Sequence, residues 1–130
     1  MVSSMKSLIK KIVNKINVVN KATHAPTDRD FYVGRGSVLG NPFTSKNIEE
    51  TKALYQVNSK EEAIEKYSAS LKTKINIKEG LIINTLNEMF EALKVGDINL
   101  VCYCAPDKCH GDEIKRVLNG MYVKFLMSEN

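Results

Sequence analysis

Three cysteines and one histidine lie close together near the end of the chain, in the segments Cys102-Tyr103-Cys104 and Cys109-His110-Gly111-Asp112. A cysteine beside a histidine at a helix N-terminus is a candidate nucleophile, because both surroundings favour the thiolate. We therefore predict Cys109 as a candidate catalytic residue, with His110 as an acid or base near neutral pH and Asp112 beside them.

Other interpretations of this segment stay open. Thiolates and imidazoles are the ligands that structural zinc prefers, although the spacing of Cys102 and Cys104 differs from the usual Cys-x2–4-Cys pair. Cys102 lies on a predicted strand, where a cysteine is typically a small buried hydrophobic side chain. Asp112 lies in the first turn of a predicted helix, where an acidic residue typically complements the helix dipole. We assign no metal ligand and no cofactor from the sequence.

A second group of residues suited to chemistry is a glycine-rich loop with Gly34, Arg35, Gly36 and Ser37, followed by Asn41. Glycines let a backbone approach a ligand closely, and successive N–H groups in such a loop can bind an oxyanion. Arg35 can hold a phosphate or carboxylate with two hydrogen bonds, while Ser37 and Asn41 can donate others. The loop matches neither the phosphate-binding loop that ends in Gly-Lys-Ser/Thr nor the dinucleotide fingerprint. The alternative is an elaborate turn with Arg35 in solvent.

The two segments are expected to meet. The free N–H groups in the first turn of a helix attract anions, so we expect Cys104, His110 and Gly111 to face the same ligand as the glycine-rich loop. Both segments follow predicted strands, and ligands in parallel α/β sheets bind beyond the carboxyl ends of the strands. The sequence therefore predicts one ligand site between residues 34–43 and residues 102–112.

Apolar periodicity and turn residues predict the elements that position this site. Residues 16–20, 31–33 and 99–103 have the pattern of strands. Ser59 and Glu62 have the spacing of a capping box, so a helix is expected to begin there. Gly96 ends a second helix, and the last helix is expected to begin at His110. Residues 44–58 are expected to be irregular.

Strands that alternate with helices predict a single α/β domain over residues 16–130, Rossmann-like, with three layers and a mainly parallel sheet. The pattern of residues 1–15 predicts a basic amphipathic helix that is attached to the domain as an extension. The apolar stripe of this helix is expected to pack on the domain or on a second copy. We expect the domain to fold without this segment.

Composition narrows the class of protein. The 130 residues suit one domain, and the formal charge of +4 comes from 19 Lys and Arg against 15 Asp and Glu. This excess is too mild to indicate a surface for duplex DNA. We find no signal peptide and no apolar run of the ~20 residues that a membrane span needs, and the three cysteines are clustered rather than spread. The sequence therefore predicts a cytoplasmic protein with no membrane partner.

The motifs of the glycine-rich loop and of the cysteine segment resemble those of a small domain family of unknown function found in phages and bacteria. The resemblance covers about residues 16–120 and rests on three strings: YVGRGS with GNPF (32–37 and 40–43), EAIEKY (62–67) and LVCYCAP with CHGD (100–106 and 109–112). Tyr103 stands where this family usually has tryptophan. The Cys-His pair also resembles a second uncharacterised α/β family with a Cys…Cys-His-Arg signature, although Gly111 replaces the final arginine. The resemblance implies a phage or bacterial setting and supplies no reaction.

The leading functional hypothesis is a site for a nucleotide- or nucleoside-related anionic ligand, with hydrolysis or transfer at a glycosidic or phosphate bond. The alternative is a non-enzymatic phage accessory protein that sequesters a nucleotide signal or inhibits a host protein. A second alternative is a zinc-stabilised nucleic-acid-binding module. The expected partners are accordingly a small anionic ligand, a host protein, or a second copy that docks through the N-terminal helix.

Overall fold

The computed structural model describes residues 14–46, 49, 53–105 and 107–128. The basic helix expected over residues 1–15 lies outside the described residues, except for Asn14 and Lys15, which are irregular. None of the described helices is long and apolar enough to cross a membrane.

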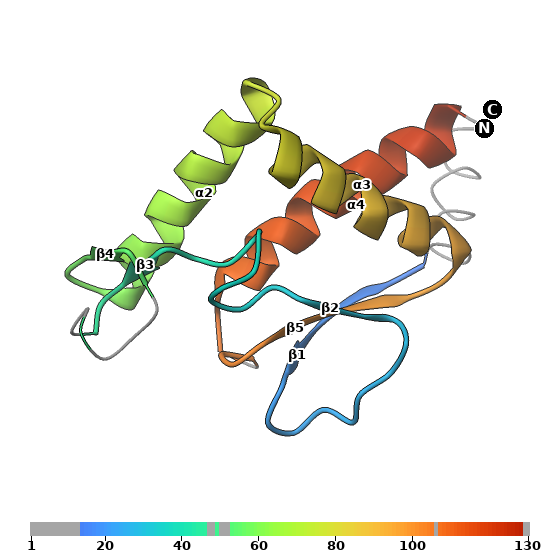
Figure 1. The fold of residues 1–130 in the computed structure, drawn as a ribbon. Helices are drawn as coiled ribbons and strands as arrows, with labels where there is room; N and C mark the ends of the chain where they lie inside the picture. The colour runs from blue at the N-terminus through green and yellow to red at the C-terminus, as the bar shows by residue number, and fades with distance from the viewer. Residues whose placement is uncertain (1–13, 47–48, 50–52, 106, 129–130) are drawn as a thin grey trace.

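A parallel three-stranded sheet lies at the centre of the described chain. Its strands are β1 (Ile16–Asn20), β5 (Ile98–Cys102) and β2 (Asp30–Tyr32), in that order across the sheet (Figure 1). The three predicted strands are confirmed, with β2 and β5 each beginning one residue earlier than expected. β5 occupies the central place because its side chains are almost all buried, which suits a strand with a neighbour on each side.

Three long helices follow the predicted order: α2 (Lys60–Asn76), α3 (Gly80–Val95) and α4 (His110–Ser128). The predicted cap of α2 is confirmed, because the N–H of Glu62 donates to Ser59 Oγ at 3.0 Å. The helices pack their apolar stripes on the sheet and on one another. The largest fully buried side chains of the resulting core are Leu39, Met89, Leu93, Ile98, Leu100, Ile114 and Leu118.

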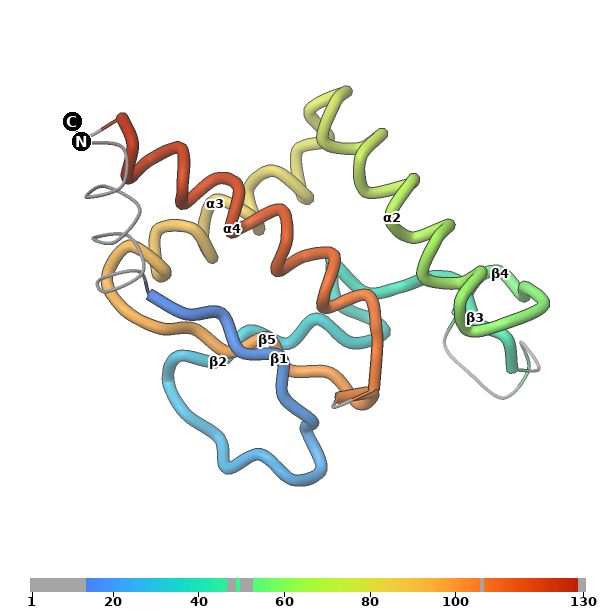
Figure 2. Tube along the Cα trace, turned by 180° about the vertical axis from the view of Figure 1, so that it is seen from behind, coloured from blue at the N-terminus to red at the C-terminus, as the bar shows by residue number. Residues whose placement is uncertain are grey.

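The other face of the sheet carries a row of polar side chains. The strand register aligns Asn17, Asn99 and Asp30 across the three strands. Asn99 accepts a hydrogen bond from Asn17 at 3.1 Å and donates one to Asp30 at 3.0 Å. The connection of residues 21–29 between β1 and β2 runs on the side of the sheet away from the helices in both views (Figures 1 and 2). His24 joins this connection to the sheet, with Nε2 3.0 Å from Asp30 Oδ1.

Two expectations about the architecture need adjustment. The mixed α/β class and the parallel sheet are confirmed, but a Rossmann-like three-layer arrangement is not: in the part of the chain described, α3 and α4 lie on the same side of the sheet (Figures 1 and 2). The polar row gives the physical reason, since it offers no apolar surface for a helix. The expectation that residues 44–58 are irregular is wrong at two places, because β3 (Phe43–Thr44) and β4 (Tyr55–Gln56) form a short parallel pair.

Candidate functional site

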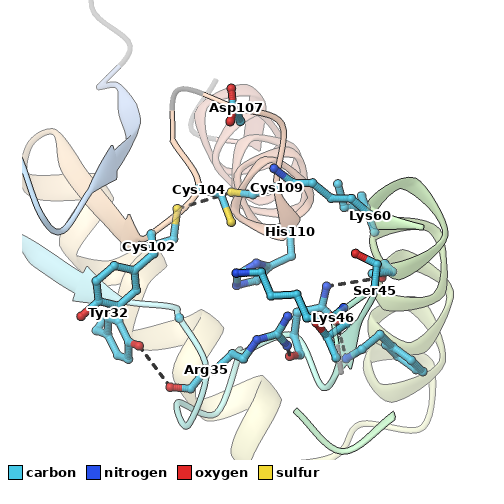
Figure 3. A pocket seen from close by; sticks show the side chains of 17 residues that line it. Tyr32, Arg35, Ser45, Lys46, Lys60, Cys102, Cys104, Asp107, Cys109 and His110 are labelled. Carbon is cyan, nitrogen blue, oxygen red and sulfur yellow. Dashed lines mark hydrogen bonds between the residues drawn. The ribbon is translucent and has the colours of Figure 1, made fainter. Parts of the chain in front are cut away.

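A pocket of about 600 Å³ opens where β2 and β5 end (Figure 3). Three parts of the chain line it: the segment that follows β2, the segment between β5 and α4, and the first turn of α2. The polar, aromatic and thiol side chains of the lining include those of Tyr32, Arg35, Asn41, Lys46, Lys60, Tyr103, Cys104, Asp107, Cys109 and His110. The two segments that the sequence singled out therefore border the same space, as expected for the carboxyl ends of parallel strands.

The glycine-rich loop is built from two consecutive tight turns. The N–H of Ser37 donates to the carbonyl of Gly34 at 3.2 Å, and the N–H of Gly40 donates to the carbonyl of Ser37 at 3.0 Å. Gly36 occupies the third position of the first turn with φ +91°, which is the position where a type II turn requires glycine. The Ser37 hydroxyl also donates to Gly34, at 2.6 Å. Ser37 and Gly36 therefore shape the loop and are not among the residues that line the pocket.

Arg35 is held in the pocket wall by its neighbours. Its guanidinium donates to the carbonyl of Asn41, and its own carbonyl accepts from the Tyr32 hydroxyl at 3.1 Å. Burial lowers the pKa of Arg35, with opposing contributions from Cys104 and Tyr32. Among the described residues Arg35 pairs with no carboxylate. The remaining N–H groups of its fork are thus free to meet an anion.

Two lysines join Arg35 around the pocket, and the sequence analysis did not select them. Lys46 reaches across the opening toward His110, and Lys60 extends from the first turn of α2 toward Cys109 (Figure 3). In the described part of the chain neither lysine forms an ion pair with Asp or Glu. Among the described residues that line the pocket, Asp107 is the acidic one, and it is exposed. The lining is therefore positively charged.

His110 lies at the centre of the pocket and is only 6% exposed. Its Nε2 is hydrogen-bonded to the carbonyl of Val33. A carbonyl only accepts, so Nε2 carries the proton and Nδ1 is the acceptor nitrogen of the neutral ring. Burial lowers the pKa of His110, which favours this neutral form. The ring packs edge-on against Tyr67, at a centroid distance of 5.0 Å.

The residues around the start of α4 mostly bond to one another. The N–H of Cys109 donates to Asp112 Oδ2 at 3.2 Å, and the N–H of Gly111 donates to Cys109 Sγ at 3.3 Å. The Asp112 carboxylate thus caps the helix, and its place in the first turn agrees with the alternative that it complements the helix dipole. Neither Asp112 nor Gly111 is among the pocket-lining residues. A Cβ at Gly111 would lie 3.0 Å from Val18, so this glycine lets α4 pack closely on β1.

The three cysteines form one cluster of free thiols at the floor of the pocket. Cys102 Sγ lies 3.4 Å from Cys109 Sγ, and these residues are 1% and 2% exposed. Cys104 is half-buried and is the accessible member of the cluster. Within the described ranges, no three His, Cys, Asp or Glu side chains are arranged to hold a metal ion.

The structure thus brings some of the predicted site residues together and separates others. Those that border the pocket are Gly34, Arg35, Asn41, Cys104, Cys109 and His110, whereas Gly36, Ser37, Gly111 and Asp112 support its walls. Asn41 does both, because its side chain also donates to Ala63 in α2 at 3.3 Å and accepts from the N–H of Phe43. One feature of the sequence could have indicated a role for Lys60. A lysine in the first turn of a helix is unfavourable to the helix dipole, which indicates that it is there for another reason.

The fold and the pocket define a small α/β domain with a basic, thiol-lined pocket beyond the ends of parallel strands. A family model described as "Domain of unknown function (DUF4326)" matches residues 16–120, and the chain belongs to this family. The family predicted from the motifs is thereby confirmed as one of unknown function. No curated protein and no solved structure matches the chain.

Proposed function

We propose that this pocket binds a small phosphate-bearing ligand of the nucleotide class. The observation that carries the proposal is the convergence of Arg35, Lys46 and Lys60 on one pocket, with no carboxylate partner for any of them among the described residues. Arg35 is half-buried, and half-buried positive charge without a counter-charge is costly, so an anionic ligand would relieve that cost. Lys46 and Lys60 are exposed and add positive charge at the opening.

The size and the rims of the pocket support the nucleotide class. A volume of about 600 Å³ lies within the roughly 300–1,000 Å³ typical of small-molecule sites. Tyr32 and Tyr103 border the opening, are 40% and 59% exposed, and contact each other edge to face at 6.4 Å. Lys21 Nζ lies over the Tyr32 ring at 4.8 Å and over the Tyr103 ring at 5.9 Å. A base would therefore stack on the ring surface that Lys21 leaves exposed while the phosphate meets Arg35.

A reaction at this site would depend on His110. Because Nε2 is engaged by the carbonyl of Val33, Nδ1 is the nitrogen that can accept a proton. A neutral imidazole is suited to act as a base toward a hydroxyl or a water beside the bound ligand. We propose hydrolysis or transfer at a phosphate or glycosidic bond as the reaction, with sequestration of the ligand as the alternative if no product forms.

Calorimetry with the full chain tests the binding proposal. The panel consists of mono-, di- and cyclic nucleotides, with a nucleoside and inorganic phosphate as partial ligands. We expect at least one nucleotide to bind below millimolar Kd, and Arg35→Lys to weaken it about tenfold, because a point charge loses the paired hydrogen bonds of the fork. Arg116→Lys is the matched control, since Arg116 lies on α4 outside the pocket and pairs with Glu113.

Two results would contradict the proposal. One is the absence of any nucleotide binding below millimolar, in which case a protein partner becomes the better hypothesis. The other is equal affinity of Arg35→Lys and the unchanged protein. Incubation of the tightest ligand with the protein, followed by chromatography of the products, then separates an enzyme from a sequestering protein. Turnover that His110→Gln abolishes supports catalysis.

A further inference from the structure

The cysteine cluster has an arrangement that ligand binding does not require. Cys109 lies between the other two thiols: its sulfur is 3.4 Å from that of Cys102, and its side chain lies beside that of Cys104. Figure 3 shows the Cys104 and Cys109 sulfur atoms side by side at the floor of the pocket. The Cys109 sulfur therefore has a neighbouring sulfur on each side with which a disulfide could form.

The three thiols differ in their exposure to small reagents. Cys102 and Cys109 are 1% and 2% exposed, whereas Cys104 is half-buried and borders the pocket. A small oxidant that enters the pocket therefore meets Cys104 first. The other two sulfurs become reachable only when the structure opens locally.

The surroundings of Cys104 favour its thiolate. The hydrogen bond from Cys109 is the main cause that lowers the pKa of Cys104 to about 6, and the charges of Lys60 and Arg35 lower it further. The same hydrogen bonds raise the pKa of Cys109, which stays a protonated thiol, and the bond to Cys102 lowers the pKa of that thiol to about 6 as well. Exposure is therefore what distinguishes Cys104 from Cys102. An accessible thiolate beside a buried thiol is the arrangement of a reactive cysteine and its resolving partner.

We propose that Cys104 is an oxidation site for hydrogen peroxide and that Cys109 resolves it to an intramolecular disulfide. In the first step the Cys104 thiolate attacks one peroxide oxygen, the O–O bond breaks, and hydroxide leaves with the electron pair and takes up a proton to form water. The product is Cys104 sulfenic acid. In the second step the Cys109 sulfur attacks the Cys104 sulfur, the S–O bond breaks, and the hydroxyl leaves as water with the proton of the Cys109 thiol. In total two thiols are oxidised, one peroxide is reduced, and two waters form.

The disulfide changes the pocket that contains it. The bond removes the negative charge that Cys104 places near Arg35 and Lys60, and it ties the end of β5 to the start of α4. The chemistry does not depend on the identity of the pocket's ligand. Its failure would leave the proposed nucleotide binding intact, and the absence of nucleotide binding would leave the oxidation intact.

Peptide mapping of the full chain without substitutions tests the proposal. The protein is treated with hydrogen peroxide under native conditions, alkylated and digested with trypsin, which cuts after Lys94, Lys108 and Lys115. The expected disulfide joins peptide 95–108 to peptide 109–115, and fragmentation distinguishes Cys104 from Cys102. Before oxidation, brief alkylation should label Cys104 about tenfold faster than either buried thiol, because those thiols react only after local opening.

Variants then assign the two roles. Cys109→Ser should leave Cys104 sulfenic acid unresolved, so that dimedone traps it. Cys104→Ser should prevent the disulfide, and Cys102→Ser is the matched control that should still form it. A bond between Cys102 and Cys109 with Cys104 still free would overturn the proposal. So would three unmodified thiols in the folded protein after peroxide treatment.

Discussion

The imidazole of His110 donates a hydrogen bond to the main-chain carbonyl of Val33, which lies 77 residues earlier in the chain. Val33 directly precedes the glycine-rich loop, and His110 is the first residue of α4. This one bond therefore joins the two segments that border the pocket. Both partners are buried, at 0% and 6% exposure, so water cannot replace either of them.

Substitution of His110 should destabilise the protein, and the loss should be smaller when the new side chain keeps an N–H donor for the carbonyl of Val33. His110→Ala leaves the buried carbonyl of Val33 without a partner, and we expect it to lower the free energy of unfolding by about 2 kcal/mol or more. His110→Gln keeps an N–H donor and should cost about 1 kcal/mol. Urea unfolding measures both values. Equal losses for the two variants would show that packing rather than the hydrogen bond matters here.

Stability should fall as the pH is lowered through the range of His110. Burial lowers the pKa of His110 below its usual 6.5, so the unfolded chain binds the proton more readily than the folded protein. The stabilisation is therefore present above pH 6.5 and is lost as the pH falls toward the pKa of the folded state. For one proton the slope reaches at most about 1.4 kcal/mol per pH unit.

Urea unfolding between pH 8 and pH 5 checks this dependence. His110→Gln should flatten the profile, whereas His24→Gln should keep it, because the buried imidazole remains. The range stops at pH 5 because carboxylates titrate below it, including Asp30, whose pKa is lowered mainly by the N–H of Thr27. Parallel profiles for the unchanged protein and His110→Gln would rule out His110 as the source.

Gly40 should tolerate no side chain. A Cβ at this position would lie 2.5 Å from the carbonyl oxygen of Gly34 and 3.1 Å from that of Ser37, and both are main-chain atoms that cannot turn away. We expect Gly40→Ala to lower the free energy of unfolding by about 2 kcal/mol or more, because the loop must open. Gly120→Ala on α4 is the matched control: its Cβ meets nothing within 4 Å, and alanine should stabilise the helix by about 0.5–1 kcal/mol. Thermal or urea unfolding compares the two, and a neutral Gly40→Ala would show that the loop relaxes without cost.

Much of the local structure was predictable because it depends on neighbouring residues. Ser59 and Glu62 mark the start of α2 through one side chain and one N–H three residues apart. Gly36 marks a turn because only glycine adopts its positive φ without strain. The strand at β5 was predictable from a nearly continuous apolar run, and such a run favours a central position in a sheet.

The layers of the fold were not predictable in the same way. Asn17, Asn99 and Asp30 lie far apart in the sequence, and each by itself is an ordinary polar residue of a strand. Only the register of three parallel strands aligns them into one hydrogen-bonded row. That row makes one face of the sheet polar. A helix gains little by packing its apolar stripe on a polar face, and the described helices α3 and α4 lie on the other side (Figures 1 and 2).

The sequence by itself determined which segments border the site, since glycine turns, a helix start and strand ends are local features and parallel strands end at one edge. Tertiary structure decided which side chains face the pocket. Lys46 and Lys60 join Arg35 only because α2 packs beside the segment that follows β2, while Asp112 turns back to cap its own helix. It also decided that Cys104 is accessible and that Cys109, the sequence's candidate nucleophile, is buried. The exposure of a side chain and the charge around it depend on residues from distant parts of the chain, so a pattern of neighbouring residues does not predict them.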